Sequence, residues 1–273
     1  MIGLAAAIAF VVTGQTDRLN VAFSVQTLEL GTLKVCLYPG FAPFSSKDEK
    51  REWVGWDVSY LQNFARHKNL TFEPVEIENF AGIWNLPGED RCDIAASGIS
   101  DFPKRREETG DKGLWSDPYY QVIRAMAVRT ADRHKLKSIK DLRGKTVIVT
   151  SRSTADIDLR NRMEQADIDS VTIKNTADER DAAIKVRDGH GKQAPFAYAG
   201  GYGSIELLVE ELGGLSLVWP HCLMDARGDR KAEPFSFVAR AASTGLLESL
   251  NEYAEKPVQY PPVQFPSPKI GTR

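Results

Sequence analysis

The sequence has little of several features that assign a protein to a class directly. Its formal net charge is only −2 at pH 7, which gives no signature of nucleic-acid or membrane binding. Its 3 cysteines and 4 histidines include no C-x-x-C pair and no Cys/His spacing suited to zinc. It has no H-E-x-x-H, no G-x-S-x-G, no P-loop and no G-x-G-x-x-G after a strand. We therefore expect no metal, no cofactor and no nucleic-acid partner.

The apolar run at Ile2–Val12 is too short to span a bilayer as a helix. With the small and polar residues 13–15 after it, it resembles the apolar region of a secretory signal, although a basic start is missing. The alternative is an ordinary buried helix or strand. We expect residues 1–14 to be a signal segment and residues 15–32 to be an N-terminal arm.

The three cysteines are Cys36, Cys92 and Cys222. Cys36 lies in the first expected strand and Cys92 immediately precedes the third, and these two strands should be neighbours in a doubly wound sheet. A disulfide between them is one interpretation, and it fits an exported protein. Two small buried thiols are the other.

Apolar periodicity alternates between strand and helix along the chain. Strands are expected over residues 33–37, 71–76, 93–97, 122–128, 146–150, 171–174, 196–199 and 235–239. Helices are expected over residues 56–68, 81–86, 138–142, 153–166 (with Ser153 or Thr154 as N-cap), 178–188, 202–212 and 244–255. This order predicts an α/β fold with parallel sheets covered by helices on both faces. The proline-rich residues 257–273 have no apolar periodicity and should be extended or disordered.

Two stretches belong together at the expected sheet edge. Residues 33–57 indicate a strand, a loop with aromatic residues, a polar hairpin, and Gly55-Trp56-Asp57 opening a helix. Residues 93–106 indicate a short buried strand and a Ser/Gly loop followed by Arg105. A guanidinium fork matches the two oxygens of a carboxylate, and open α/β sheets bind ligands at the carboxyl ends of their strands. The arrangement predicts a receptor for a small acid, such as an amino acid.

These residues also carry a resemblance to a known family. Four segments resemble, in order and spacing, the motifs of the family-3 periplasmic solute-binding proteins: Val35–Asp57, Asp93–Arg105, Ser116–Tyr119 and Leu142–Val147. Members of that family are the polar amino-acid receptors of ABC importers. The resemblance has few gaps from residue 33 to about residue 160 and continues loosely to about residue 256.

The resemblance implies a type II periplasmic-binding-protein fold, with two doubly wound lobes, a hinge, and a ligand cleft between the lobes. It places residues 33–121 and 235–256 in lobe 1 and residues 130–216 in lobe 2, with the hinge near residues 121–130 and 216–234. It also implies a periplasmic or secreted protein that delivers its solute to the membrane permease of an ABC importer. We expect the protein to act as a monomer.

In this family the arginine at the position of Arg105 grips the α-carboxylate of the ligand, beside hydroxyl and backbone donors of the loop. The resemblance therefore implies carboxylate binding by Arg105 together with Ser97, Gly98 and Ser100. The alternatives are a solvated arginine at a helix start and serines that only form a turn.

An aromatic residue at Phe41 matches the stacking position of the family, and Tyr38 and Trp53 should complete the apolar wall. Ordinary packing of lobe 1 is the alternative for these rings. Family members that select basic side chains tend to carry an acid at the position of Tyr38. Lysine or arginine is therefore a less expected ligand.

Lobe 2 should contribute Ser153 and Thr154, at a helix N-terminus where hydroxyls and free N–H groups favour an anion. The family has a glycine before the Thr or Ser, and Arg152 replaces that glycine. Arg152 is either a solvated loop residue or a second guanidinium in the cleft.

In amino-acid receptors of the resembled family, an aspartate near residues 199–202 commonly binds the ammonium group of the ligand. This chain has Ala-Gly-Gly-Tyr there, so that acid is missing. The nearest acid, Glu206, is expected at the surface. A dicarboxylate or keto acid therefore rivals an amino acid as the ligand.

Two other functions on this fold stay open, a ligand-sensing domain and a dehydratase-like lyase. A lyase needs a carboxylic acid beside the departing group, and the sequence shows no candidate. We expect the protein not to be an enzyme.

Overall fold

The computed structural model describes residues 25–191 and 193–255. The expected signal segment (1–14) and C-terminal tail (257–273) lie outside the described residues, and the expected N-terminal arm is described only from residue 25. Within the described part, no helix is long and apolar enough to cross a membrane.

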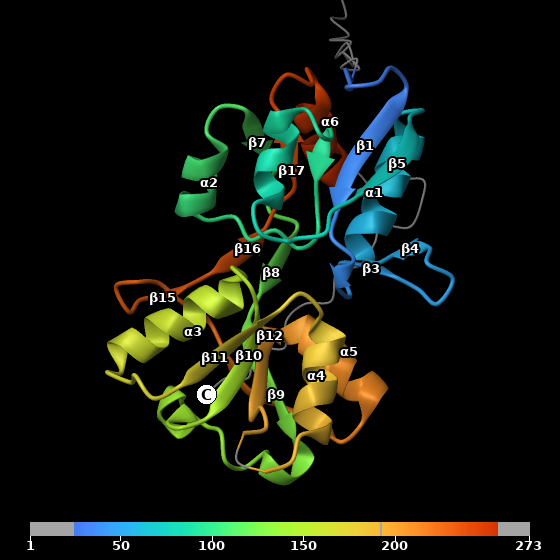
Figure 1. The fold of residues 1–273 in the computed structure, drawn as a ribbon. Coiled ribbons are helices and arrows are strands. Elements are labelled where there is room, and N and C mark those ends of the chain that lie inside the picture. Colours follow the sequence, from blue (N-terminus) through green and yellow to red (C-terminus); the bar gives the residue numbers. More distant parts are fainter. Residues whose placement is uncertain (1–24, 192, 256–273) are drawn as a thin grey trace, which may run out of the picture.

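Two five-stranded sheets form two lobes, the upper and lower halves of the molecule in Figure 1. The sheet of lobe 1 has the order β5-β1-β6-β17-β7. Its strands are β1 (Thr32–Leu37), β5 (Thr71–Glu76), β6 (Ile94–Ala95), β7 (Gly113–Trp115) and β17 (Val238–Arg240). Strand β1 pairs in parallel with β5 and β6, whereas β17 runs antiparallel to β6 and β7. The chain therefore returns to its first sheet near the end of the described residues.

Alternation along β1 builds both faces of lobe 1. Leu33, Val35 and Leu37 pack in one apolar cluster with residues of α1 and α6, while Cys36 lies in the cluster on the opposite face. The helices of this lobe are α1 (Trp56–His67), α2 (Pro103–Thr109), α6 (Leu246–Glu255) and the 3₁₀ helix η1 (Ile83–Glu89). A small sheet of β2 (Gly40–Phe41), β3 (Ser45–Lys47) and β4 (Trp53–Val54) follows β1.

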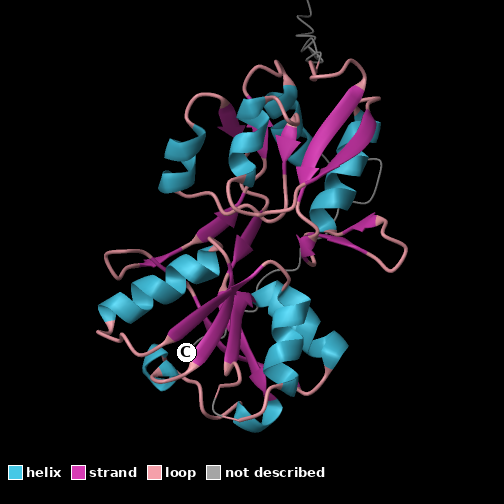
Figure 2. Cartoon of the chain, in the orientation of Figure 1, coloured by secondary structure: helices cyan, strands magenta, loops and turns pink. Residues whose placement is uncertain are grey.

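Lobe 2 repeats the arrangement with the strand order β11-β10-β12-β9-β13. Its strands are β9 (Arg124–Arg129), β10 (Thr146–Thr150), β11 (Thr172–Thr176), β12 (Ala197–Gly201) and β13 (Leu215–His221). Its helices are α3 (Thr154–Gln165), α4 (Glu179–Asp188), α5 (Tyr202–Leu212) and the 3₁₀ helices η2 (Thr130–Asp132) and η3 (Ile139–Leu142). Val147 and Val149 of β10 pack with residues of α3, and Ile148 packs with residues of α4 and α5. Helices thus flank both sheets (Figure 2).

The two lobes are joined by an antiparallel ribbon of β8 (Tyr120–Val122) and β16 (Glu233–Phe235), which lies between them in Figure 1. A second ribbon, β14 (Leu223–Met224) with β15 (Arg230–Lys231), precedes β16. The expected hinge ranges 121–130 and 216–234 were too wide, because β9 and β13 are strands of the second sheet. Apolar periodicity predicted a strand over 122–128 but not its place in the second sheet, because β9 pairs with neighbours that are distant in the sequence.

Two further expectations differ in detail from the structure. The strand expected over 93–97 shortens to β6, because the chain leaves the sheet where Ser97 and Gly98 adopt φ values of 114° and 59°. The strand expected over 235–239 divides into β16 and β17, one in the ribbon and one in the sheet. Strands β7 and β13 were not expected, and a helix near Arg105 entered only through the alternative interpretation of that residue.

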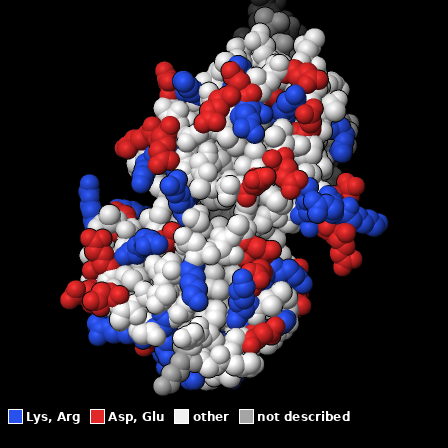
Figure 3. Space-filling model, viewed as in Figure 1, with Lys and Arg blue, Asp and Glu red and all other residues white. Residues whose placement is uncertain are grey.

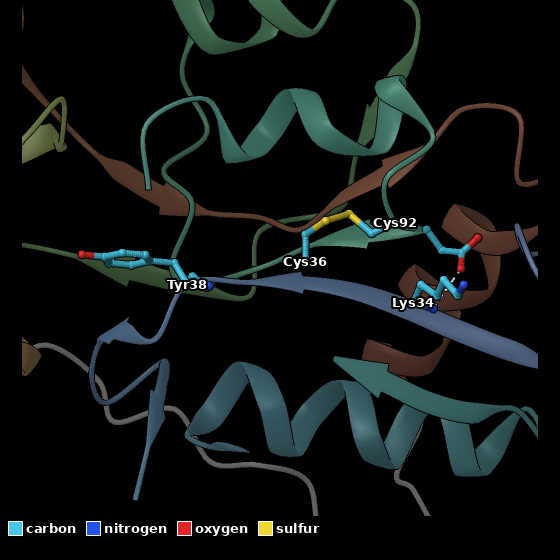
Figure 4. The surroundings of a disulfide bond; sticks show 6 residues. Lys34, Cys36, Tyr38 and Cys92 are labelled. Atoms are coloured by element: carbon cyan, nitrogen blue, oxygen red, sulfur yellow. Dashed lines mark hydrogen bonds between the residues drawn. A yellow bond between two sulfur atoms is a disulfide. The ribbon is translucent and has the colours of Figure 1, made fainter. Parts of the chain in front are cut away.

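Cys36 and Cys92 form a disulfide with 5.7 Å between their Cα atoms. Figure 4 shows the bond linking β1 to the residue that leads into β6, the strand that pairs with β1. The structure thus decides the alternative that the sequence left open. Cys222 is free and half-buried.

Charged side chains of both signs are spread over the visible face of both lobes (Figure 3). This distribution agrees with the net charge of −2. A preference for ligands of one charge must therefore arise from the few charged groups inside the cleft.

Candidate functional site

The lobes meet at the carboxyl ends of β1, β6 and β10, and direct hydrogen bonds cross between them. The Tyr38 hydroxyl donates to the backbone oxygen of Ala177. Ser100 Oγ lies 2.7 Å from Thr154 Oγ1, and Arg105 Nη2 lies 3.4 Å from the backbone oxygen of Arg152. The cleft is therefore in a closed conformation.

A pocket lies at this junction, with about 280 Å³ of space between atoms, part of which is open to solvent. Both lobes and the connecting ribbon contribute to its lining: Tyr38, Phe41, Phe80, Gly98, Ser100, Arg124, Thr150, Ser153, Thr154 and Phe235. Tyr38, Gly98 and Ser153 follow the ends of strands, as expected for a ligand site on open α/β sheets.

A buried carboxylate organises the loop after β6. Asp57, in the first turn of α1, accepts hydrogen bonds from the backbone N–H groups of Ser97 and Gly98, both at 2.8 Å, and from the Tyr119 hydroxyl at 2.9 Å. Burial raises the pKa of Asp57 to about 6, against the opposing effect of these donors. Asp57 does not line the pocket but holds the backbone that does.

The geometry of this loop excludes a side chain at Gly98. A Cβ atom there would lie 2.5 Å from Cε1 of Phe41, and the φ of +59° favours glycine. Close approach of the loop backbone to the Phe41 ring is therefore possible only without that atom.

Arg105 lies in α2 beside the pocket and is 2 % exposed. Its guanidinium lies 4.2 Å from the ring centre of Trp84 and 4.7 Å from that of Phe102. Nη1 donates to the backbone oxygen of Ser100 at 3.1 Å. Burial lowers the pKa of Arg105 to about 9, so the group stays charged at neutral pH. In the described part of the chain Arg105 makes no ion pair, which leaves a buried cation with free donors.

Aromatic rings form the apolar wall of the pocket. Phe41 lies 5.7 Å from Phe80 and 6.3 Å from Phe235, centre to centre, and all three line the space. Tyr38 adds its ring, 5.9 Å from that of Phe80.

The N-terminus of α3 forms the wall on the side of lobe 2. Ser153 is the N-cap, and its hydroxyl accepts from the backbone N–H of Asp156 at 3.3 Å. Thr154 is the first helical residue and is buried. Both line the pocket, and the helix end supplies partial positive charge there.

A second buried arginine, Arg124 at the start of β9, also lines the pocket. Its Nε donates to Glu233 Oε2 at 2.7 Å, and its Nη2 donates to Oε1 of the same carboxylate. The two side chains are 4 % and 1 % exposed. Arg124 is thus a cation with an acid already bound to it, unlike Arg105.

One more acid is buried near the pocket. Glu179, the first residue of α4, accepts a hydrogen bond from the hydroxyl of Tyr198 in β12. Burial raises the pKa of Glu179 to about 8, although the Tyr198 hydroxyl and the charge of Arg124 oppose the shift. Glu179 is therefore mostly protonated and uncharged at neutral pH.

Comparison with known proteins identifies this architecture. Residues 33–257 match the profile of the bacterial extracellular solute-binding proteins, family 3. The chain belongs to this family. Among solved structures, the arginine-bound form of truncated ArgBP from T. maritima is similar, with a TM-score of 0.67, 25% sequence identity, and coverage of 82% of this chain and 94% of that chain.

Two curated relatives match over shorter stretches. The membrane-bound lytic murein transglycosylase F of Saccharophagus degradans is 32% identical over 101 residues, which are 37% of this chain and 19% of the relative. The cyclohexadienyl dehydratase of Pseudomonas aeruginosa is 28% identical over 154 residues, 54% of this chain and 55% of the relative. The matched parts thus span about half or less of the length of these relatives.

Six of the ten residues expected to hold the ligand of this family-3 protein line the pocket: Tyr38, Phe41, Gly98, Ser100, Ser153 and Thr154. Arg105 adjoins them through its bond to Ser100. The structure corrects the expectation for the other three, Ser97, Trp53 and Arg152.

Each of the three corrections has a local cause. The Ser97 hydroxyl faces the interior of lobe 1, where it accepts from the Tyr38 N–H at 2.9 Å. Trp53 is half-buried in the β3–β4 hairpin, where Lys47 Nζ lies 5.1 Å from its ring centre. Arg152 has a φ of 55° and an exposed side chain, so only its carbonyl turns toward Arg105.

Sequence reasoning missed Phe80, Arg124, Thr150 and Phe235 of the lining and Glu233 behind it. A signal existed for Arg124, a charged residue inside the otherwise apolar stretch 122–128. The sequence gave no such signal for Glu233, because its partner Arg124 lies 109 residues away in the chain. Residues 199–202 bring no acid to the pocket, and Glu206 is exposed as expected.

Proposed function

We propose that this protein is an extracytoplasmic solute-binding protein that delivers a small carboxylate, an amino acid or a close relative, to the membrane permease of an ABC importer. The observation that carries the proposal is Arg105, a fully buried guanidinium without an ion pair in the described chain, held beside the pocket by its bond to the backbone oxygen of Ser100. A desolvated guanidinium with free donors is a strong carboxylate partner. Periplasmic or secreted placement and a monomeric state are parts of the same proposal.

The charges around the pocket favour a ligand with net negative charge. Arg105 and Arg124 are cations, Glu233 is the acid paired with Arg124, and Glu179 is mostly neutral at pH 7. Asp57 is mostly ionised at pH 7 but lies behind the loop and does not line the pocket, so Arg105 is the cation beside the pocket without an ion pair in the described chain. An ammonium group opposite no free acid would cost several kcal/mol of desolvation. We therefore propose that a keto acid binds at least as well as its amino-acid counterpart.

Arg152 does not act as a second free guanidinium for a dicarboxylate in the cleft, because its side chain is exposed. Arg124 takes the place of a second guanidinium, but it is already paired.

The ligand of the arginine-bound structural neighbour does not transfer to this chain. A cationic side chain would enter a pocket that is lined by the guanidinium of Arg124, adjoins that of Arg105, and has Tyr38 where an acid would be needed. We propose that arginine and lysine bind poorly or not at all.

Isothermal titration calorimetry against amino acids, keto acids and dicarboxylates, with arginine and lysine included, tests the proposal. We expect binding of at least one small acid and a rise in melting temperature with the same compound. Failure of every compound in both assays would refute the receptor function. A preference of about tenfold for the amino acid over its keto acid would refute only the part about the ammonium group.

A dehydratase is the second candidate, because one relative is a cyclohexadienyl dehydratase and because Glu179 is a protonated acid near the cleft. Incubation with prephenate-like or hydroxylated amino-acid substrates would then give product at a rate proportional to protein concentration. Stoichiometric binding without product would favour transport.

A further inference from the structure

A carboxylate of the protein itself is bound at the edge of the ligand pocket. Glu233 Oε1 accepts from Ser100 Oγ at 2.5 Å and from Arg124 Nη2, while Oε2 accepts from Arg124 Nε at 2.7 Å. Glu233 belongs to the connecting ribbon, Ser100 to lobe 1 and Arg124 to lobe 2. The acid therefore binds donors from both lobes at once.

Hydrogen counting shows where the hydroxyl protons point. Ser100 has a single hydroxyl proton, and it is donated to Glu233. The contact of 2.7 Å between Ser100 Oγ and Thr154 Oγ1 must then be a donation from Thr154. Both hydroxyl protons are thus directed along one chain that ends at Glu233, and they are not available to a ligand.

The same is true of the guanidinium of Arg124. Its fork is matched by both oxygens of Glu233, which is the geometry in which arginine binds a carboxylate most strongly. Arg124 nevertheless lines the pocket, so a ligand would meet this cation if Glu233 were not bound to it.

We propose that Glu233 is a specificity-determining residue: as a built-in counter-ion of Arg124, it restricts the pocket to ligands with one carboxylate and excludes dicarboxylates. This inference rests on the proposed function. A second carboxylate of the ligand would lie close to the carboxylate of Glu233 and would be repelled by its charge. It could not bind Arg124 instead, because that guanidinium is already paired with Glu233. Arg105, the cation beside the pocket that has no ion pair in the described chain, then binds the one carboxylate of the ligand.

Removing the charge of Glu233 should change which acids bind. In Glu233→Gln, Arg124 loses its counter-ion and becomes free to bind a second carboxylate from the pocket side. Affinity for dicarboxylates should rise much more than affinity for monocarboxylates. In the double variant Arg124→Gln/Glu233→Gln the free guanidinium is absent, and the gain should disappear.

The probes are four compounds with five carbon atoms, which separate the second carboxylate from the amino group: 2-oxopentanoate, 2-oxoglutarate, norvaline and glutamate. Four- and three-carbon analogues extend the set if the pocket is too small. The pairs to compare are 2-oxopentanoate with 2-oxoglutarate and norvaline with glutamate. In calorimetry on the full chain, the wild type should bind the monocarboxylate of each pair more tightly by about tenfold or more. Glu233→Gln should shift this affinity ratio toward the dicarboxylate by about tenfold or more. Glu206→Gln, which removes one exposed acid of lobe 2, should leave the ratio unchanged.

Three results would overturn the inference: an unchanged ratio in Glu233→Gln, an equal shift in the double variant, or a loss confined to norvaline and glutamate. The last would identify Glu233 as the acceptor of the ammonium group. If Glu233→Gln does not fold, the wild type still decides: binding of 2-oxoglutarate or glutamate as tight as that of the matching monocarboxylate would overturn the inference. Absence of binding by every compound to the wild type would instead refute the proposed function.

Discussion

At the scale of single residues, the important groups of this protein combine a binding role with a structural one. Arg105 is expected to bind the ligand carboxylate, yet its guanidinium also packs against Trp84 and Phe102. Asp57 does not line the pocket, yet it holds the N–H groups of the loop that does. Substitutions at such positions must keep the volume of the side chain if they are to report on charge alone.

Arg105→Met retains most of the packing volume and removes the charge. We expect it to weaken binding of the best-binding acid by about 2–4 kcal/mol, because the lost interaction is a desolvated charge pair. Calorimetry measures the affinity, and urea unfolding checks the fold. Arg106→Met is the matched control, because Arg106 is 53% exposed and pairs with Asp101. Equal affinity in Arg105→Met would show that the carboxylate binds elsewhere.

Asp57→Asn tests how much free energy of unfolding the protein loses by burying the charged Asp57 carboxylate that holds the loop. The pKa of Asp57 rises from 3.8 to about 6 on burial, so the folded state binds a proton that the unfolded state releases. The wild type should therefore lose about 2–3 kcal/mol of stability between about pH 4 and pH 7 that Asp57→Asn does not lose.

Urea unfolding of both proteins across this pH range measures the difference. Asp111→Asn, at an exposed position of lobe 1, is the control and should show no such divergence. Parallel stability curves for the wild type and Asp57→Asn would contradict the raised pKa.

At the scale of elements, α3 connects the pocket to the chain that leads back to lobe 1. Its N-terminus lines the pocket through Ser153 and Thr154. One face of the same helix holds the segment after β13: Asn161 donates to the Met224 carbonyl at 2.9 Å, and Arg162 donates to the Cys222 carbonyl at 2.5 Å. A shift of α3 on ligand binding would therefore move the segment that leads to the ribbon.

Asp158 is the central residue of this contact. Its carboxylate accepts from Arg162 Nε at 3.0 Å, from His221 Nε2 at 2.9 Å and from the Met224 N–H at 2.6 Å. Although burial acts to raise the pKa of Asp158, His221 and Arg162 together hold it below its usual value.

Asp158→Asn should lower the free energy of unfolding by about 3–5 kcal/mol at neutral pH, because it leaves the buried guanidinium of Arg162 without its acid. Since the folded pKa is depressed, this stabilisation is present above about pH 4 and fades as the pH falls through the folded pKa. Asp181→Asn, which breaks an exposed ion pair with Lys185 on α4, should cost about 0.5 kcal/mol or less. A similar small cost for Asp158→Asn would show that the cluster contributes little.

At the scale of the whole molecule, the two lobes differ in how they are stabilised. Lobe 1 carries the disulfide between β1 and the start of β6, whereas lobe 2 has no disulfide among its described residues and relies on buried ion pairs such as that of Asp158. Reduction should therefore act on lobe 1 and spare lobe 2.

The double variant Cys36→Ala/Cys92→Ala should lose about 2–4 kcal/mol of unfolding free energy, because the bond closes a loop across a sequence separation of 56. Chemical denaturation with fluorescence detection measures the loss, and Cys222→Ala serves as the control without a disulfide. A stability equal to that of the control would show that the bond does not form in the protein.

The sequence alone was sufficient wherever a local pattern decides the structure. The bounds of β5, β10 and α5 were predicted as observed, because apolar spacing within each segment selects strand or helix. Ser100, Thr154 and Phe41 were named from motifs and line the pocket, and Arg105 adjoins it, whereas their role in ligand binding stays a prediction.

The tertiary structure decided everything that depends on contacts between distant segments. Three features join residues that are far apart in the chain: the antiparallel pairing of β9 and β13, the disulfide between Cys36 and Cys92, and the ion pair of Arg124 with Glu233. Arg152 shows the same limit within one loop, since its backbone conformation directs the side chain outward. Which cation is free and which is paired was therefore settled by packing, because a charge in a protein is defined by its three-dimensional neighbours.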